Sequence, residues 1–184
     1  MRPPARLRRT YFDCRFGQLH VYQAIPPGGG FDEATALLCI PGAMGEGRFF
    51  QALLAPLGAD RSIYAPDLPG SGMSDAPAAP SGVEQHAQAL LDLLDSLRQR
   101  RIDVIAHAAG TDIAAALAAA RPNALVRRVV CSGASPGSLA AVRKQCSNCD
   151  ELTLGGAADA AISTATAQAQ CDDLIRILGS AQAG

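Results

Sequence analysis

Hydrophobic and polar positions alternate in two short segments near the start of the chain, and continuous apolar runs follow them. The alternating segments, RTYFDCRF (9–16) and QLHVYQAI (18–25), lie on either side of Gly17. A period of two with so short a connection predicts a β-hairpin. Four later runs are typical of strands covered on both faces of a sheet: TALLCI (35–40), SIYAPDL (62–68), IDVIAHA (102–108) and VRRVVCSGA (126–134).

Helical patterns separate these apolar runs. Helices are expected at 47–58 and at 112–120, where Pro122 stops the second one. A third should begin near Ser81 and Glu84, which have the spacing of a capping box. Its apolar face would be made by Val83, Ala87, Leu90, Leu91, Leu94 and Leu97. Strand and helix thus alternate from about residue 35 to 134, which predicts an α/β fold with a mostly parallel sheet and helices on both faces.

The pattern weakens after about residue 138, where we expect loop and helix but no further strand. The sheet would then end after the sixth strand, 126–134, and its open edge would be covered by the C-terminal helix or by a second copy of the chain in a homodimer. One apolar helix face is expected here, from Ile162, Leu174, Ile175 and Leu178. We divide the chain into a core over residues 1–137, whose residues 1–9 form a disordered arm, and a C-terminal segment over residues 138–184.

Composition narrows the class of protein. The chain has 184 residues, 48% hydrophobic and 18% charged, with a formal net charge of −1. There is no basic surplus for nucleic-acid binding, and no stretch has the length of a membrane span. Six cysteines without a signal peptide indicate free thiols and a cytoplasmic location. Cys146 and Cys149 form a C-x-x-C pair, but the spacing of zinc ligands and the strand before a thioredoxin-like motif are both missing, so we expect no metal and no cofactor.

Several motifs resemble those of the α/β-hydrolase superfamily. APDLPGSGMSDAP is similar to that family's D-x-x-G-x-G-x-S loop, and CIPGAMGEGRFF is similar to its segment after the third strand, with Pro41 where His is usual. The resemblance covers residues 10 to 137 and implies a three-layer fold that opens with an antiparallel hairpin. It assigns the loop motif to Asp67, Gly70, Gly72 and Ser74. We expect Asp67 to order this loop through backbone hydrogen bonds.

The same resemblance identifies AHAAG, residues 106–110, as the nucleophile elbow, a sharp turn from strand to helix. The nucleophile position holds Ala108, which has no lone pair for attack. The family's catalytic histidine comes late in the chain, yet the three histidines here are His20, His86 and His107, and none follows the elbow. Triad hydrolysis is therefore not expected.

Other residues near the elbow have two interpretations each. His107 is the candidate for acid–base chemistry, since its ordinary pKa is near neutrality, but a packed or hydrogen-bonded histidine is the preferred interpretation. Asp112, in the first turn of the helix, is read as structural because a carboxylate there favours the helix dipole. Backbone donors of the oxyanion type are implied at Ala43, Met44 and Ala109, and without a nucleophile they could still bind a carbonyl or carboxylate.

Three hypotheses about function follow. The preferred one is a catalytically silent domain that binds a small molecule or a partner. The second is an enzyme that keeps the fold and uses a non-serine mechanism, through His107 or an activated water. The third is a truncated relative without independent activity, whose C-terminal segment is the remnant of a cap region or the product of a shifted reading frame.

Overall fold

The structure, a computed structural model of the chain, describes residues 4–28, 34–42, 44–122, 125–154, 162 and 164–179. Seven strands form one sheet in the order β1-β2-β4-β3-β5-β6-β7, in which β1, β2 and β4 pair antiparallel and the remaining pairs are parallel. The strands are β1 (Arg6–Cys14), β2 (Gly17–Ile25), β3 (Leu37–Ile40), β4 (Ile63–Pro66), β5 (Ile102–His107), β6 (Val126–Ser132) and β7 (Cys149–Glu151). The helices are η1 (Gly47–Phe50, a 3-10 turn), α1 (Gln51–Leu57), α2 (Val83–Ser96), α3 (Gly110–Ala120), α4 (Pro136–Gln145) and α5 (Thr164–Gly179).

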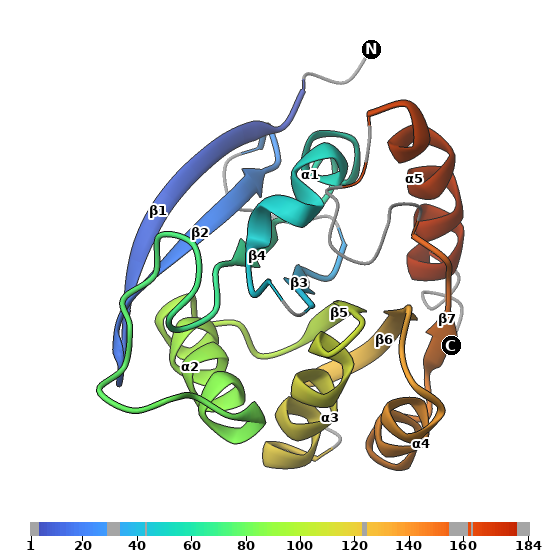
Figure 1. Cartoon of the computed structure of the whole chain (residues 1–184). Coiled ribbons are helices and arrows are strands. Elements are labelled where there is room, and N and C mark those ends of the chain that lie inside the picture. The colour runs from blue at the N-terminus through green and yellow to red at the C-terminus, as the bar shows by residue number, and fades with distance from the viewer. Residues whose placement is uncertain are drawn as a thin grey trace.

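Helices cover both faces of the sheet in three layers (Figure 1). Helices α2, α3 and α4 lie on one face, while α1 and α5 lie on the other. The first core includes Leu90, Leu94 and Leu117, and the second includes Phe50 and Leu174, all of them less than 1% exposed. Each such side chain stabilises the fold by roughly 1.5–3 kcal/mol when buried. The predicted hairpin and the predicted α/β sheet with helices on both faces are confirmed.

A seventh strand corrects the expectation that the sheet ends after the sixth. Strand β7 pairs parallel with β6, and Val129, Val130 and Cys131 lie opposite its three residues. The strand is too short to show a period of two, and one of its residues is Asp150, so its sequence carries no strand signal. We expected the edge of β6 to be open and to pair with a second copy of the chain. At these three residues that edge is instead paired with β7. The expected boundary at residue 137 lies within α4.

Part of the segment expected to form a disordered N-terminal arm is a β-strand. Residues 6 to 9 belong to β1 and pair with residues 22 to 25 of β2. Their side chains are exposed, so the arginines keep their charge in solvent while the backbone extends the hairpin. The expectation of a disordered arm over residues 1–9 is wrong for these four residues because backbone pairing does not require an apolar pattern.

Two helix predictions need correction in detail. Helix α2 begins one residue later than the proposed capping box, since Gly82 is its N-cap and the Gly82 N–H donates to Gln85 Oε1 at 3.0 Å. In the C-terminal segment, Ile162, Leu174 and Leu178 are buried as expected. Ile175 is 48% exposed and does not belong to that face.

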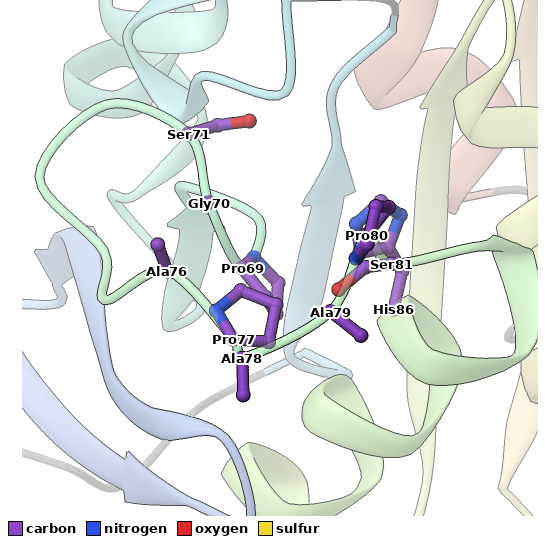
Figure 2. Close-up of a pocket in the computed structure, with 10 residues that line it drawn as sticks. All are labelled: Pro69, Gly70, Ser71, Ala76, Pro77, Ala78, Ala79, Pro80, Ser81 and His86. Carbon is purple, nitrogen blue, oxygen red and sulfur yellow. The ribbon is translucent and has the colours of Figure 1, made fainter.

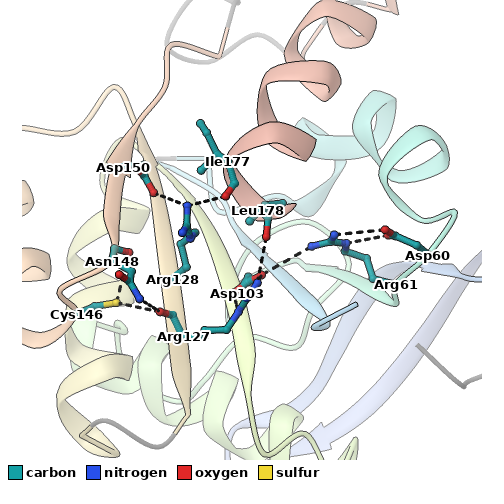
Figure 3. Close-up of polar contacts among 10 residues, drawn as sticks. All are labelled: Asp60, Arg61, Asp103, Arg127, Arg128, Cys146, Asn148, Asp150, Ile177 and Leu178. Carbon is teal, nitrogen blue, oxygen red and sulfur yellow. Dashed lines mark hydrogen bonds and ion pairs between the residues drawn. The ribbon is translucent and has the colours of Figure 1, made fainter. Parts of the chain in front are cut away.

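A polar cluster holds α5 against the ends of β5 and β6 that lie away from the elbow (Figure 3). The Arg127 guanidinium donates two hydrogen bonds to the fully buried Asp103 and one to the Leu178 carbonyl. Arg128 donates to Asp150 and to the carbonyl of Ile177. The two arginines therefore bind carbonyls in the last turn of α5, where the helix dipole favours positive charge.

Candidate functional site

The turn between β5 and α3 has the geometry that the elbow motif predicts. Strand β5 ends at His107, Ala108 follows with φ +45°, and α3 begins at Gly110. The left-handed conformation costs an alanine about 1–2 kcal/mol. Two backbone hydrogen bonds hold it, from Ala108 N to Ser132 O at 2.7 Å and from Thr111 N to Ala108 O at 3.0 Å.

The close approach of α3 to β3 explains the glycine at the start of the helix. A Cβ on Gly110 would lie 2.5 Å from the Pro41 carbonyl oxygen and 2.7 Å from that of Ile40. No side chain fits in this space, so the residue after the turn must be glycine for the helix to leave the strand at this angle. The turn thus has the backbone conformation and the small residues that a nucleophile elbow needs, but the side chain at its tip is the methyl group of Ala108.

His107 packs on the α1 side of the sheet. Its ring stacks on Phe49 with centroids 4.3 Å apart and planes 21° apart, and the residue is 6% exposed. This contact agrees with the packed interpretation. An acid–base role for His107 stays a prediction, and the ring is not among the groups that line either cleft described below.

A cleft of about 260 Å³, here called the elbow cleft, opens on the other side of the turn. It lies at the carboxyl ends of the parallel strands, where α/β sheets bind ligands. Ala109 is among the residues that line it, and its role as a backbone donor stays a prediction. Met44 is 55% exposed and does not line it, while Ala43 lies outside the described residues. The full lining is Gly42, Gly45, Leu68, Ser71, Ser81, Gly82, Val83, His86, Ala109, Asp112 and Ile113.

The loop motif forms one wall of the elbow cleft, and a buried carboxylate orders it as predicted. Asp67, 1% exposed, accepts hydrogen bonds from Gly47 N at 2.7 Å and Met73 N at 3.0 Å, and its Oδ2 lies 2.9 Å from His20 Nδ1. The Ser74 hydroxyl donates to the Asp67 carbonyl at 2.7 Å.

A glycine at position 72 is required by the same arrangement. Gly72 has φ +53°, and a Cβ there would overlap Asp67 Oδ2. Asp67, Gly72 and Ser74 therefore act together to fix the loop.

A second, larger cleft lies along this loop (Figure 2). This loop cleft has a volume of about 470 Å³ and is lined by residues 69–71, 76–81 and 86. Three side chains line both clefts: Ser71, Ser81 and His86. The Ser81 hydroxyl is buried and has no hydrogen-bond partner among the described residues.

His86 is the titratable group that the sequence gave no reason to place at the site. It lies on the first turn of α2, and half-burial lowers its pKa below the ordinary value, opposed by a hydrogen bond to the Pro69 backbone. A neutral imidazole at neutral pH offers one donor and one acceptor. Asp112, read from sequence as structural, lines the elbow cleft together with His86. The signal that could have found His86 is its position in the first turn of the helix that follows the loop motif.

Neither a metal site nor a membrane-crossing helix is found in the described part of the chain. No group of three or more His, Cys, Asp or Glu side chains there could hold a metal ion. Likewise, none of the helices described there combines the length and the apolarity that a bilayer crossing needs. The polar side chains that line the elbow cleft are the hydroxyls of Ser71 and Ser81, the imidazole of His86 and the carboxylate of Asp112.

Comparisons with known proteins agree with this geometry. Residues 35–159, more than half of the chain, match the model of the alpha/beta hydrolase fold family. Uncharacterised proteins of Mycobacterium bovis and Mycobacterium tuberculosis are 31% identical over 97 residues, which is 53% of this chain and 28% of theirs. The chain thus spans 28% of the length of these curated relatives.

Solved hydrolases share the fold. The epoxide hydrolase CorEH superposes with a TM-score of 0.63 at 20% identity, over 71% of this chain and 44% of that one. The carboxylesterase CesB of Bacillus subtilis gives 0.59 at 21% identity over 68% and 42%, and the N-acyl homoserine lactonase AidH gives 0.61 at 24% identity over 71% and 46%. The match to the family model, together with the elbow turn and the ordered loop motif, shows that the chain belongs to the α/β-hydrolase fold family.

Proposed function

We propose that this chain is a member of the family that does not hydrolyse its ligand and binds a small molecule with a neutral carbonyl group in the elbow cleft. The observation that carries the proposal is Ala108 in the left-handed turn, followed by Ala109 on the wall of a cleft of about 260 Å³. A methyl group cannot attack a carbonyl carbon, so covalent catalysis by this residue is excluded.

Binding without attack is supported by the groups that the turn leaves in place. The first backbone N–H groups of a helix have no partner within it and carry a partial positive charge. The N–H groups of Thr111 and Asp112 donate to the carbonyls of Ala108 and Ala109, so the donors of this kind at the cleft wall are the N–H groups of Ala109 and Gly110. They suit a carbonyl oxygen, which accepts hydrogen bonds.

Asp112 narrows the ligand class. Its carboxylate lines the same cleft, so a ligand with its own negative charge would be repelled there. Esters, amides and lactones lack that charge. The apolar walls from Leu68, Val83 and Ile113 suit a short alkyl chain, and the loop cleft beyond Ser71 provides room for a longer one.

A thermal-shift screen with short-chain esters and amides tests the proposal. Binding to the folded chain raises the melting temperature, and the shift grows with the ratio of ligand concentration to Kd. Ala109 is exposed, so Ala109→Phe should fill the elbow cleft without disturbing the core, and its stabilisation by ligand should be lost. Ala120→Phe, an exposed alanine at the far end of the same helix, is the matched control and should respond like the unmodified chain. Equal shifts in both variants would place binding elsewhere.

A second candidate, an enzyme that activates water, is favoured by one observation. The half-buried His86 lines the same cleft as Ala109, and its lowered pKa keeps it neutral and able to accept a proton near neutral pH. This hypothesis rests on His86 rather than on His107, whose ring is stacked on Phe49. Ester turnover that disappears in His86→Asn and persists in His107→Asn would support it over silent binding.

A further inference from the structure

Two thiols meet where the last two strands of the sheet pair. Cys131 Sγ of β6 lies 3.9 Å from Cys149 Sγ of β7. The parallel register places Cys149 opposite Val129, two residues before Cys131 on β6. Because side chains alternate along a strand, Cys131 and Cys149 project from the same face of the sheet.

The neighbouring thiol is engaged elsewhere. Cys146, the first cysteine of the C-x-x-C pair, contacts two backbone carbonyls, those of Arg127 at 3.8 Å and Asn148 at 3.5 Å (Figure 3). It donates its proton to these acceptors and is held at the end of α4. The spatial partner of Cys149 is therefore Cys131, which the sequence spacing does not indicate.

We propose that Cys131 and Cys149 form an oxidation site, where a small disulfide such as oxidised glutathione converts the two thiols into a disulfide that joins β7 to β6. All six cysteines are reduced in the structure. The site is independent of the elbow cleft and uses no group proposed for ligand binding.

The reaction proceeds in two exchange steps. Cys149 is partly exposed, whereas Cys131 is 1% exposed, so the deprotonated Cys149 sulfur attacks the glutathione disulfide first. This forms a mixed disulfide and releases one glutathione thiolate. The deprotonated Cys131 sulfur then attacks Cys149 Sγ and expels the second glutathione thiolate. The two protons lost by the cysteines are taken up by the two thiolates, so two protein thiols are oxidised and one glutathione disulfide is reduced.

The surroundings of Cys131 govern the rate of the second step. Burial, together with a smaller contribution from the adjacent Cys149, raises the pKa of Cys131 to about 12. Since only the thiolate attacks, closure should be slow at neutral pH and should accelerate as the pH rises. The pair is thus expected to respond to sustained oxidation rather than to a brief exposure.

Closing the bond has a consequence for the edge of the sheet. Strand β7 has three residues and is the last strand, so it is held to β6 by few backbone hydrogen bonds. A disulfide would tie it to a buried position of β6 and close the loop that contains α4. Cα atoms that are offset by two positions on neighbouring parallel strands lie about 8 Å apart, so closing the bond must also draw this short strand along β6. A loop of this size constrains the unfolded chain enough to raise the melting temperature by roughly 5 °C or more.

The test is to incubate the full chain with excess oxidised glutathione at mildly alkaline pH, alkylate the remaining thiols and map the disulfides by mass spectrometry without reduction. After digestion with trypsin and with a protease that cleaves at Asp150 or Glu151, the Cys146→Ser variant removes ambiguity, because the peptide with residue 149 then carries neither Cys146 nor Cys171 and a cross-link to the peptide with residue 131 can involve only Cys131 and Cys149. We expect this cross-linked pair, lighter by two hydrogens than the separate peptides, together with a higher melting temperature that a reductant reverses.

Matched variants separate a specific site from general thiol oxidation. The cross-link and the reversible melting shift should be lost in Cys149→Ser and kept in Cys171→Ala, which alters a buried cysteine in the other core. A disulfide between Cys146 and Cys149 in the unmodified chain, a stable glutathione adduct on Cys149 with Cys131 still alkylated, or six alkylated cysteines would each overturn the proposal.

Discussion

Replacing the buried carboxylate of Asp67 by an amide should destabilise the loop that forms the cleft wall. The carboxylate accepts two backbone hydrogen bonds, from Gly47 and Met73, and a third contact joins it to His20. Asn in place of Asp67 keeps one acceptor oxygen and presents an NH₂ group to the remaining donors. A hydrogen bond to a charged group contributes about 1.5–3 kcal/mol, and one or two of them are lost, so we expect Asp67→Asn to lower the free energy of unfolding by about 1.5–6 kcal/mol.

Equilibrium unfolding in urea, followed by far-UV circular dichroism, measures this loss. The control is Asp75→Asn in the same loop, where an exposed carboxylate accepts a hydrogen bond from Gln18 N at 2.8 Å, which the amide oxygen of Asn can still accept. We expect that control to lose less than about 1 kcal/mol. Equal losses in the two variants would refute the claim that burial and multiple donors at Asp67 order the loop.

Three further perturbations have defined outcomes. Gly110→Ala should destabilise the chain by about 3 kcal/mol or more in urea unfolding, since its Cβ meets the Pro41 carbonyl oxygen, whereas Gly137→Ala in α4, with only Ser135 Oγ at 3.8 Å, should be neutral or stabilising. The ring of His86 should titrate below the ordinary histidine pKa of 6.5 in an NMR pH series. As the pH falls below 6.5, this imidazole is protonated in the unfolded chain before it is protonated in the folded chain, so the free energy of unfolding falls. His86→Asn should therefore reduce the slope of the free energy of unfolding against pH. Asp103→Asn should cost about 3–5 kcal/mol in urea unfolding because it leaves a nearly buried arginine without its counterion, and a loss under 1 kcal/mol would contradict that reasoning.

Periodicity and turn chemistry were enough to predict the central layers of the fold. The apolar runs at 35–40, 62–68, 102–108 and 126–134 contain β3, β4, β5 and β6. These strands are covered by helices on both faces of the sheet, so most of their residues are apolar and the sequence shows continuous hydrophobic runs. The loop motif was predicted equally well, because Asp67 and Gly72 are local determinants of the same turn.

The elements that the sequence did not predict depend on pairing between distant segments. Strand β7 exists because β6 offers it hydrogen bonds, and the start of β1 is ordered by β2 although its side chains are exposed. At the site, the same limit applies to His86, which reaches the elbow cleft only because α2 begins beside α3. Likewise, the Phe49–His107 stack and the Cys131–Cys149 contact join residues far apart in sequence.

Isothermal titration calorimetry with a short-chain methyl ester tests the central claim most directly, because one experiment reports both binding and turnover. If the elbow cleft binds carbonyl compounds without attacking them, each injection should give a heat pulse that returns to the baseline, and the pulses should saturate. Ala109→Phe should abolish that saturation, because the new side chain occupies the cleft. A sustained heat flow proportional to enzyme concentration would show hydrolysis, and the absence of any saturable heat would show that the cleft does not bind such ligands.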